Sequence, residues 1–328
     1  MKKRALGTTG HEVSELGFGG WGLGADMWRG VEDSEGCDAL RAAVEDGVTF
    51  FDTALAYGRG HSERLMGQVL RDEIRDGRAV VATKVPPLNE EWPGHSSRSV
   101  AEVFPARHIS ACTEESLRNL GVDALAVQQL HVWHDAWLDD PEWGASYERM
   151  ARLKEEGKVL HWGISLNDHA PATALRALAD PIFETAQVIY NIYDRSPEGA
   201  LFDLARTKPL GVIVRVPFDE GALTGRIRSD TVFPAGDWRE LYFQGDRRAE
   251  AERRAEALAQ LLDDEVETLP ELALRFVLSS ADVSTVIPGM RRAEHVRSNA
   301  AASKKGPLSP GMLSQLEAHA WDKNWYPA

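Results

Sequence analysis

The sequence predicts an α/β fold, a (β/α)8 TIM barrel that forms a single domain over residues 1–328. Short apolar runs rich in β-branched residues recur along the chain, and helical patterns separate them. Successive runs begin about 38 residues apart, the length of one strand, one crossover helix and two loops. One barrel core can use a chain this long. No GxGxxG turn leads from a strand into a helix, which argues against an open doubly wound sheet.

Eight apolar runs supply the expected parallel strands. They are Leu16–Phe18, Val48–Phe51, Val80–Thr83, Leu125–Leu130, Val159–Ile164, Ala186–Ile189, Val212–Val216 and Ser284–Ile287. The segments between them carry helix punctuation. Gly121 and Gly157 stand where a glycine ends a helix, and Pro141, Pro171 and Pro197 stand where helices can begin.

Three segments fall outside this repeat. Residues 1–15 are expected to form an N-terminal β-hairpin that caps the bottom of the barrel, with LGTTGHEV supplying the turn. Pro86–Ala106 and Arg226–Asp246 are long loops after the third and seventh strands. Loops of this length in a compact domain are either lids over a functional site or disordered segments.

The composition limits the partners. The chain has 37 Lys and Arg against 51 Asp and Glu, a formal net charge of −14, so nucleic acid and anionic membranes are not expected to bind it. Cys37 and Cys112 are too few for a disulfide framework. The basic start MKKRALGTTGHEV has no apolar stretch after it, and no segment approaches the length of a membrane span. We therefore expect a cytoplasmic protein that acts on a small molecule; the sequence leaves homo-oligomers open.

Three ionisable residues stand directly after three successive strands. Asp52, Lys84 and His131 follow the second, third and fourth strands, and Tyr57 lies five residues after Asp52. Catalytic residues of such barrels come from the carboxyl ends of the strands, so these side chains are expected to meet. His131 also forms an HxxH pair with His134, but no helix places them on one face with an acidic ligand. No metal site is expected.

The set suits proton transfer to a carbonyl oxygen. The pKa of a tyrosine is ordinarily about 10, and an adjacent Lys84 ammonium is expected to lower the pKa of Tyr57. Asp52 would hold Lys84 charged, and His131 would hydrogen-bond the substrate oxygen. Taken singly, these residues could be a loop cap, a surface lysine and a buried histidine. Their joint placement favours reduction of an aldehyde or ketone.

The segment FFDTALAYGRGHSERLMGQVL resembles the signature of the aldo-keto reductase superfamily. Asp52 and Tyr57 match that family's catalytic aspartate and tyrosine. ATK, ending at Lys84, and QQLH, ending at His131, resemble its two remaining catalytic positions. The resemblance covers nearly the whole chain and implies reduction of an aldehyde or ketone to an alcohol, with hydride from a nicotinamide and a proton from Tyr57. A keto intermediate of a biosynthetic pathway is one candidate substrate.

The resemblance also implies which residues hold the cofactor. The matching segments are RALGTTGHEVSELGFGGWGLG, HWGISLND, QVIYN, VPFDEGALTGR and VIPGMRRAEHVRSN. They assign to the cofactor Gly19, Gly20, Trp21, Asp52, Ser165, Asn167, Gln187, Arg215, Val216, Pro217, Phe218, Gly221, Leu223, Arg226, Gly289, Arg291, His295 and Asn299. Ser165, Asn167 and Gln187 are expected to bind the carboxamide.

The cofactor implied is NADPH (NADP). Arg291 and Arg292 offer positive charge to a ribose 2′-phosphate, although both could instead form the solvated first turn of the last barrel helix. Three positions depart from the family's common pattern. Leu166 intervenes before the asparagine, and His295 stands where glutamine or arginine is frequent. Arg215 stands where many members stack an aromatic ring on the nicotinamide, and it adds a positive charge there.

The substrate pocket is expected above the tetrad. Trp21, Trp92 and Trp133 are expected to line it together with Tyr57 and His131, and aromatic residues of the C-terminal tail could join them. The family also includes potassium-channel β subunits, which bind the same cofactor and act mainly through partners. A regulatory binding protein is therefore the alternative. The complete tetrad favours the enzyme.

Overall fold

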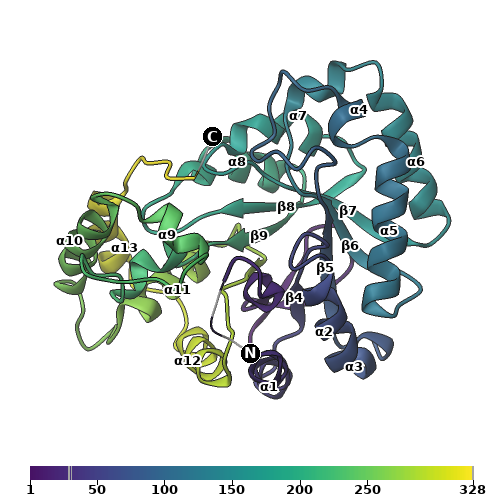
Figure 1. Ribbon diagram of the computed structural model, residues 1–328. Coiled ribbons are helices and arrows are strands. Elements are labelled where there is room, and N and C mark those ends of the chain that lie inside the picture. The colour runs from purple at the N-terminus through teal and green to yellow at the C-terminus, as the bar shows by residue number, and fades with distance from the viewer. Residues whose placement is uncertain (29, 31, 327–328) are drawn as a thin grey trace.

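Eight parallel strands curl into a nearly closed barrel in the computed structural model, which describes residues 1–28, 30 and 32–326 (Figure 1). The strands are β3 (Phe18–Gly19), β4 (Phe50–Asp52), β5 (Val80–Val85), β6 (Leu125–Leu130), β7 (Val159–Ser165), β8 (Phe183–Ile189), β9 (Gly211–Arg215) and β10 (Thr285–Val286). Their order in the sheet follows their order in the chain. The predicted barrel and its eight strands are confirmed.

The seam of the barrel joins its first and last strands. Leu16 pairs with Val286, and Gly19 pairs with Gly289, as isolated parallel bridges. The Gly17 N–H also donates to the Val286 carbonyl over 2.8 Å. Because both strands at the seam are only two residues long, a few backbone contacts close the barrel.

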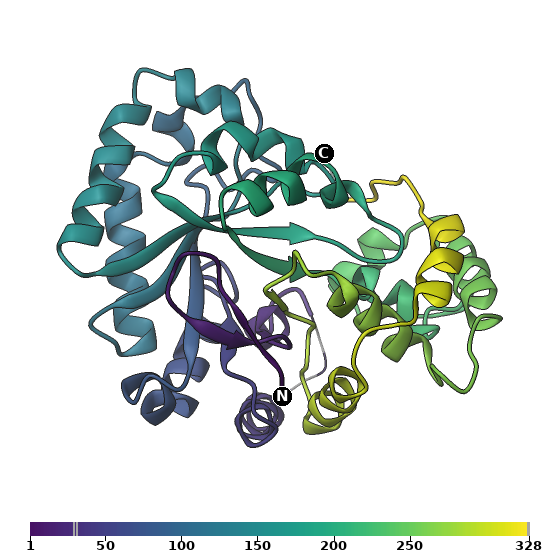
Figure 2. The ribbon, with the colours of Figure 1, turned by 180° about the vertical axis from the view of Figure 1, so that it is seen from behind.

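Helices cover the outside of the barrel. Those that follow the strands are α1 (Asp33–Glu45), α2 (His61–Val69), α3 (Arg71–Arg75), α5 (Ala106–Leu120), α6 (Trp143–Glu155), α7 (Leu175–Leu178), α8 (Ala200–Thr207), α11 (Leu269–Ser279) and α12 (Ala293–Lys304). Figures 1 and 2 show α1 and α12 side by side. Gly121 ends α5 at φ 67° and Gly157 follows α6 at φ 73°, the left-handed conformation that a terminal glycine supplies.

The N-terminal hairpin closes one end of the barrel, as the sequence predicts. β1 (Lys3–Ala5) pairs antiparallel with β2 (Glu12–Ser14), and Figure 2 shows this hairpin, in purple, in front of the strands. Leu6 and Val13 are fully buried in one cluster with Phe50 and other apolar residues of the strands. Apolar side chains therefore fill this end of the barrel.

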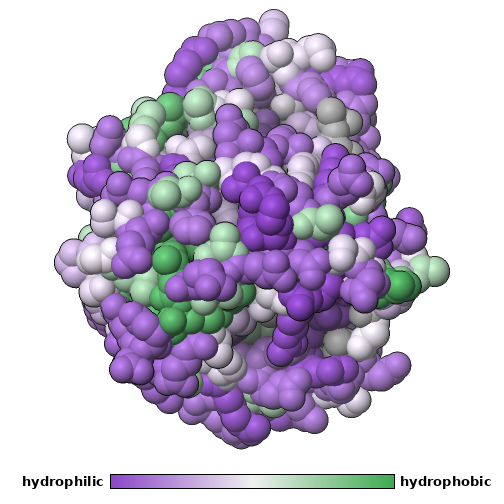
Figure 3. Space-filling view, turned by 90° about the vertical axis from the view of Figure 1, so that its left-hand side faces the viewer, coloured by the Kyte–Doolittle hydropathy of each residue, from purple (hydrophilic) through white to green (hydrophobic). Residues whose placement is uncertain are grey.

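Both predicted long loops are present, and short helices interrupt them. The loop after β5 contains α4 (Val100–Val103), and the segment after β9 contains the 3-10 helix η5 (Asp219–Thr224) and α9 (Trp238–Tyr242). The remaining helices are α10 (Arg247–Ala259), α13 (Pro310–Leu316) and the 3-10 turns η1 (Trp21–Gly24), η2 (Asp135–Asp139), η3 (Pro171–Ala174), η4 (Ser196–Glu198) and η6 (Glu317–His319). The side of the molecule that carries α10 and α13 presents mostly hydrophilic side chains (Figure 3). No helix in the described part of the chain is long and apolar enough to cross a membrane.

Candidate active site

A cavity of about 1210 Å³ opens at the carboxyl ends of the strands. It exceeds the roughly 300–1,000 Å³ usual for small-ligand pockets, so a cofactor and a substrate could share it. The residues predicted from the family pattern that line it are Gly19, Trp21, Asp52, Ser165, Asn167, Gln187, Arg215, Val216, Pro217, Phe218, Gly221, Arg226, Gly289, Arg291, His295 and Asn299. Their roles toward a cofactor stay predictions.

Gly20 and Leu223 lie behind the cavity wall. The Gly20 N–H donates to the Asp52 carbonyl over 2.8 Å, and a Cβ at Gly20 would come within 2.7 Å of that oxygen. Leu223 is 1% exposed and packs in the core. Both residues therefore shape the cavity wall without lining it. Their positions do not favour the predicted direct contact with a cofactor.

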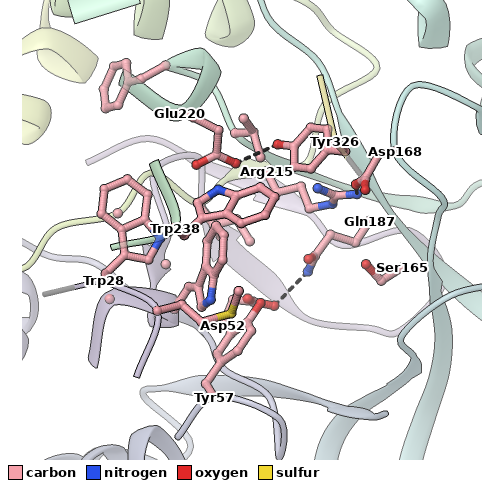
Figure 4. A pocket seen from close by; sticks show the side chains of 18 of the residues that line it. Trp28, Asp52, Tyr57, Ser165, Asp168, Gln187, Arg215, Glu220, Trp238 and Tyr326 are labelled. Carbon is pink, nitrogen blue, oxygen red and sulfur yellow. Dashed lines mark hydrogen bonds and ion pairs between the residues drawn. The ribbon is translucent and has the colours of Figure 1, made fainter. Parts of the chain in front are cut away.

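Lys84 and Asp52 form a buried ion pair at the ends of β5 and β4. Lys84 Nζ lies 2.8 and 2.7 Å from the two carboxylate oxygens and donates to the Thr53 carbonyl over 2.7 Å. Gln187 Nε2 donates to the same carboxylate over 2.7 Å (Figure 4). Burial raises the pKa of Asp52 and lowers the pKa of Lys84, and each partner opposes the shift in the other. Short charge-assisted bonds on every side favour the charged pair.

Tyr57 lies beside this pair and remains a phenol. Its hydroxyl is 3.4 Å from Lys84 Nζ. Burial raises the pKa of Tyr57 well above 10, and the charge of Asp52 adds to that increase. The predicted net decrease of this pKa is wrong, because burial and the charge of Asp52 act in the opposite direction and the ammonium directs its short bonds at Asp52 and Thr53. Tyr57 therefore keeps its proton at neutral pH and can donate it.

His131 faces Tyr57 across the cavity. The two ring centroids are 5.8 Å apart, and the centroids of the Trp92 and His131 rings are 4.5 Å apart with the rings nearly perpendicular. Burial, followed by the charges of Lys84 and Arg215, lowers the pKa of His131 well below 6.5. The imidazole is therefore neutral and carries one N–H, which suits hydrogen bonding to a carbonyl oxygen.

Asn167 holds the loop after β5 in place. Its Nδ2 donates to the carbonyls of Gly94 and Trp133 over 3.0 and 2.9 Å, and its Oδ1 accepts the Gly94 N–H over 3.0 Å. These bonds use both amide hydrogens and an oxygen lone pair. The predicted contact of Asn167 with a carboxamide would compete with the loop, so this side chain fixes the cavity wall. Ser165, at the end of β7, points into the cavity (Figure 4).

Trp133 does not line the cavity, contrary to its predicted contact with substrate. Its side chain is fully buried, packs against Trp137 and Trp143, and donates its indole N–H to Asp135. The residue follows β6 by three positions, and the chain has already turned outward there. Of the predicted aromatic lining, Trp21 and Trp92 are in place.

The C-terminal tail contributes Tyr326 to the cavity, whereas Trp325 packs outside the lining on Tyr242 and Phe243. The Tyr326 hydroxyl donates to Glu220 Oε1 over 2.6 Å (Figure 4). The tail is therefore tied to the segment after β9.

Glu220, Trp28 and Trp238 also line the cavity, but the sequence pattern did not identify them as site residues. Glu220 is 6% exposed, and burial raises its pKa to about 7. Trp238, in the predicted loop 226–246, donates its backbone N–H to the Met27 carbonyl over 2.8 Å and so joins that loop to the one after β3. The indole N–H groups of Trp28 and Trp238 have no partner among the described residues. The position of Trp238 in a long loop was the one usable clue.

Basic residues gather around His295. Burial lowers the pKa of His295, the charge of Glu294 opposes this shift, and the charges of Arg226, Arg291 and Arg292 add to it. Arg226, Arg291 and His295 all line the cavity, whereas Arg292 lies outside the lining and pairs with Glu35 over 3.3 Å. This part of the cavity can therefore receive an anionic group such as a phosphate.

Neither histidine of the HxxH pair takes part in a metal cluster. His134 accepts the Ala136 N–H at the start of η2 over 3.1 Å. Within the described ranges, no three His, Cys, Asp or Glu side chains gather closely enough to hold a metal ion.

Known proteins share this architecture and much of this sequence. Residues 15–320 match the model of the aldo/keto reductase family. An NADH-specific methylglyoxal reductase of Escherichia coli strain K12 is 31% identical over 92% of this chain and 93% of its own. A probable voltage-gated potassium channel subunit beta of Arabidopsis thaliana is 28% identical over 97% of this chain and 96% of its own. The solved holo form of aldo-keto reductase AKR11C1 from Bacillus halodurans is 27% identical, with a TM-score of 0.74 over 98% of this chain and 96% of that one.

Proposed function

Because the chain belongs to the aldo/keto reductase family and is an NAD(P)H-dependent oxidoreductase, we propose that it reduces an aldehyde or ketone to an alcohol. The observation that carries this proposal is the protonated Tyr57 hydroxyl, 3.4 Å from Lys84 Nζ and opposite the neutral ring of His131 in one cavity. These groups can deliver a proton to a carbonyl oxygen and stabilise the charge that results.

Each catalytic side chain has a distinct task. The nicotinamide, when bound, supplies the hydride that the carbonyl carbon receives. Tyr57 gives its proton to the carbonyl oxygen, and Lys84, kept charged by Asp52, stabilises the phenolate that remains. The N–H of His131 orients the carbonyl oxygen. Uptake of a proton from solvent then restores Tyr57.

Turnover of a carbonyl panel tests the function. We expect NADPH oxidation with some aldehydes or ketones, and a decrease in kcat of roughly 10²–10⁴-fold in Tyr57→Phe. Cofactor affinity should change little, because the hydroxyl serves the substrate. Full activity of Tyr57→Phe would contradict the assigned proton donor. Tight cofactor binding without any turnover would instead favour a regulatory protein like the potassium-channel β subunits.

We also infer that NADPH is the preferred cofactor. Its additional phosphate would meet the basic residues around His295, of which Arg291 lines the cavity. Quenching of tryptophan fluorescence by NADPH and NADH measures both affinities. Arg291→Gln should weaken NADPH binding by about tenfold and NADH binding much less, a size typical of one charge-assisted contact. Arg292→Gln is the matched control, since Arg292 pairs with Glu35. Equal affinities for both cofactors in the unaltered protein would contradict this preference.

A further inference from the structure

Arg215 is a charged side chain fixed beside the catalytic centre. It ends β9, and 19% of its side chain is exposed. Its Nη2 donates to Asp168 Oδ1 over 2.6 Å and to the Leu166 carbonyl over 3.1 Å. Figure 4 shows Arg215 projecting into the same cavity as Gln187 and Asp52. The two bonds hold the guanidinium in one position, so its charge is oriented before any ligand binds.

The positive charge of the Arg215–Asp168 pair acts on the tetrad, and both charges of the pair act on Glu220 and Tyr326. The positive charge of Arg215 lowers the pKa values of the four groups of the tetrad, Asp52, Tyr57, Lys84 and His131. The negative charge of Asp168 raises the pKa values of Glu220 in η5, Tyr242 in α9 and Tyr326 in the tail, and Arg215 opposes it at Glu220 and Tyr326. The catalytic side of the pair is therefore positive, although the pair as a whole is neutral.

The tetrad also holds an ion pair of its own. Lys84 and Asp52 neutralise each other across 2.7 Å. The guanidinium adds a further fixed positive charge there, and at Tyr57 it opposes the larger effect of Asp52. A hydride must reach the carbon whose oxygen receives the Tyr57 proton, so the reactive ring of a nicotinamide has to lie within the field of Arg215.

We propose that Arg215 makes this cavity bind the reduced nicotinamide cofactor in preference to the oxidised one. The inference rests on the proposed function. The oxidised ring carries a positive charge and the reduced ring is neutral, so a fixed cation nearby repels the oxidised form. With this preference, the enzyme binds mainly the reduced cofactor, which donates the hydride, and releases the oxidised cofactor faster. Arg215 is in this sense a specificity-determining residue that sets the favoured direction of the reaction.

Equilibrium titration of NADPH and NADP⁺ against tryptophan fluorescence tests the inference without turnover. We expect the ratio of the NADP⁺ Kd to the NADPH Kd to fall by roughly tenfold in Arg215→Gln, the size expected for one charge at short range in a partly screened site. Asp168→Asn should change the ratio in the opposite direction, because it removes the counter-charge. Arg206→Gln, on the outer helix α8 and paired with Asp282, makes the same change in net charge away from the cavity and should leave the ratio unchanged.

Each other outcome counts against a specific claim. If Arg215→Gln weakens both cofactor forms equally, Arg215 only supports the fold and the inference is overturned. If that variant does not fold, Arg215→Lys, which keeps the charge, and Asp168→Asn decide: an unchanged ratio in Asp168→Asn overturns the inference. Failure of the unaltered protein to bind either form would overturn the proposed function, whereas tight binding with an unaltered ratio in the variants overturns the role of Arg215 alone.

Discussion

The tetrad and the wall after β9 enclose the same cavity but are built in different ways. Asp52 and Lys84 stand on paired parallel strands, where the backbone is regular and each charge has short partners. In the wall, Val216, Asp219 and Glu220 adopt φ of 56°, 47° and 55°. The left-handed region costs roughly 1–2 kcal/mol for a residue with a side chain. The Asp52–Lys84 pair thus rests on the regular part of the fold, whereas the wall after β9 is a strained loop that other segments must hold.

The C-terminal tail supplies that support. Lys323 Nζ donates to Asp219 Oδ1 over 2.9 Å and to the Tyr242 hydroxyl over 2.8 Å. The Tyr326 hydroxyl donates to Glu220. A segment more than a hundred residues away in the chain therefore stabilises two of the three left-handed residues through their own side chains.

Replacement of Lys84, on the strand side of the cavity, should cause the largest loss of stability. Lys84→Met leaves the Asp52 carboxylate buried without its partner, which typically costs about 3–5 kcal/mol. Urea unfolding would measure the loss, and carbonyl reduction should fall together with stability. The double variant Asp52→Asn/Lys84→Met is the control and should recover part of the stability. Equal stability of Lys84→Met and the unaltered protein would show that the pair does not hold the centre together.

In the wall after β9, Glu220 should make the free energy of unfolding depend on pH. Burial raises the pKa of Glu220 from 4.5 to about 7, so the folded protein keeps this proton when the unfolded chain has lost it. The stability that protonated Glu220 provides is complete below about pH 4.5 and is lost as pH rises through 7. Relative to Glu220→Gln, the unaltered protein should therefore lose up to about 3 kcal/mol between pH 4.5 and 8. Urea unfolding of both proteins across this range checks the difference; a difference independent of pH contradicts it.

The loop after β5 should respond with a smaller effect. Asn167→Ala removes three hydrogen bonds and leaves the backbone of Gly94 without its partner. We expect a loss of about 1–3 kcal/mol and a higher KM for the carbonyl substrate, with cofactor affinity nearly unchanged. Hydrogen exchange at residues 86–105 would report loosening of the loop. Unaltered exchange and KM would mean that Asn167 does not position this wall.

The strands of the barrel and the Asp52–Lys84 pair could be predicted from the sequence. The contacts of the loops that form the cavity wall could not. Strand spacing and the residue directly after each strand are local properties, so the barrel and the meeting of Asp52 with Lys84 could be foreseen. The raised pKa of Tyr57 depends on burial and on where the lysine directs its bonds, which local spacing does not encode. Asn167 bonds to Gly94, 73 residues away, and Glu220 bonds to Tyr326, 106 residues away. Such partners follow only from how the loops and the tail fold over the barrel.

The seam between the first and last strands also affects the order of folding during synthesis. Residues 16–19 emerge from the ribosome before β4 to β9, but their partners at 286–289 emerge only after all of these strands. Until then the nascent protein carries an open sheet with an unpaired edge, the kind of surface that chaperones protect. Since Gly289, Arg291 and Tyr326 also line the cavity, the growing chain cannot complete the cavity before these residues have been translated. A product that stops before β10 would therefore lack both a closed barrel and a complete cavity.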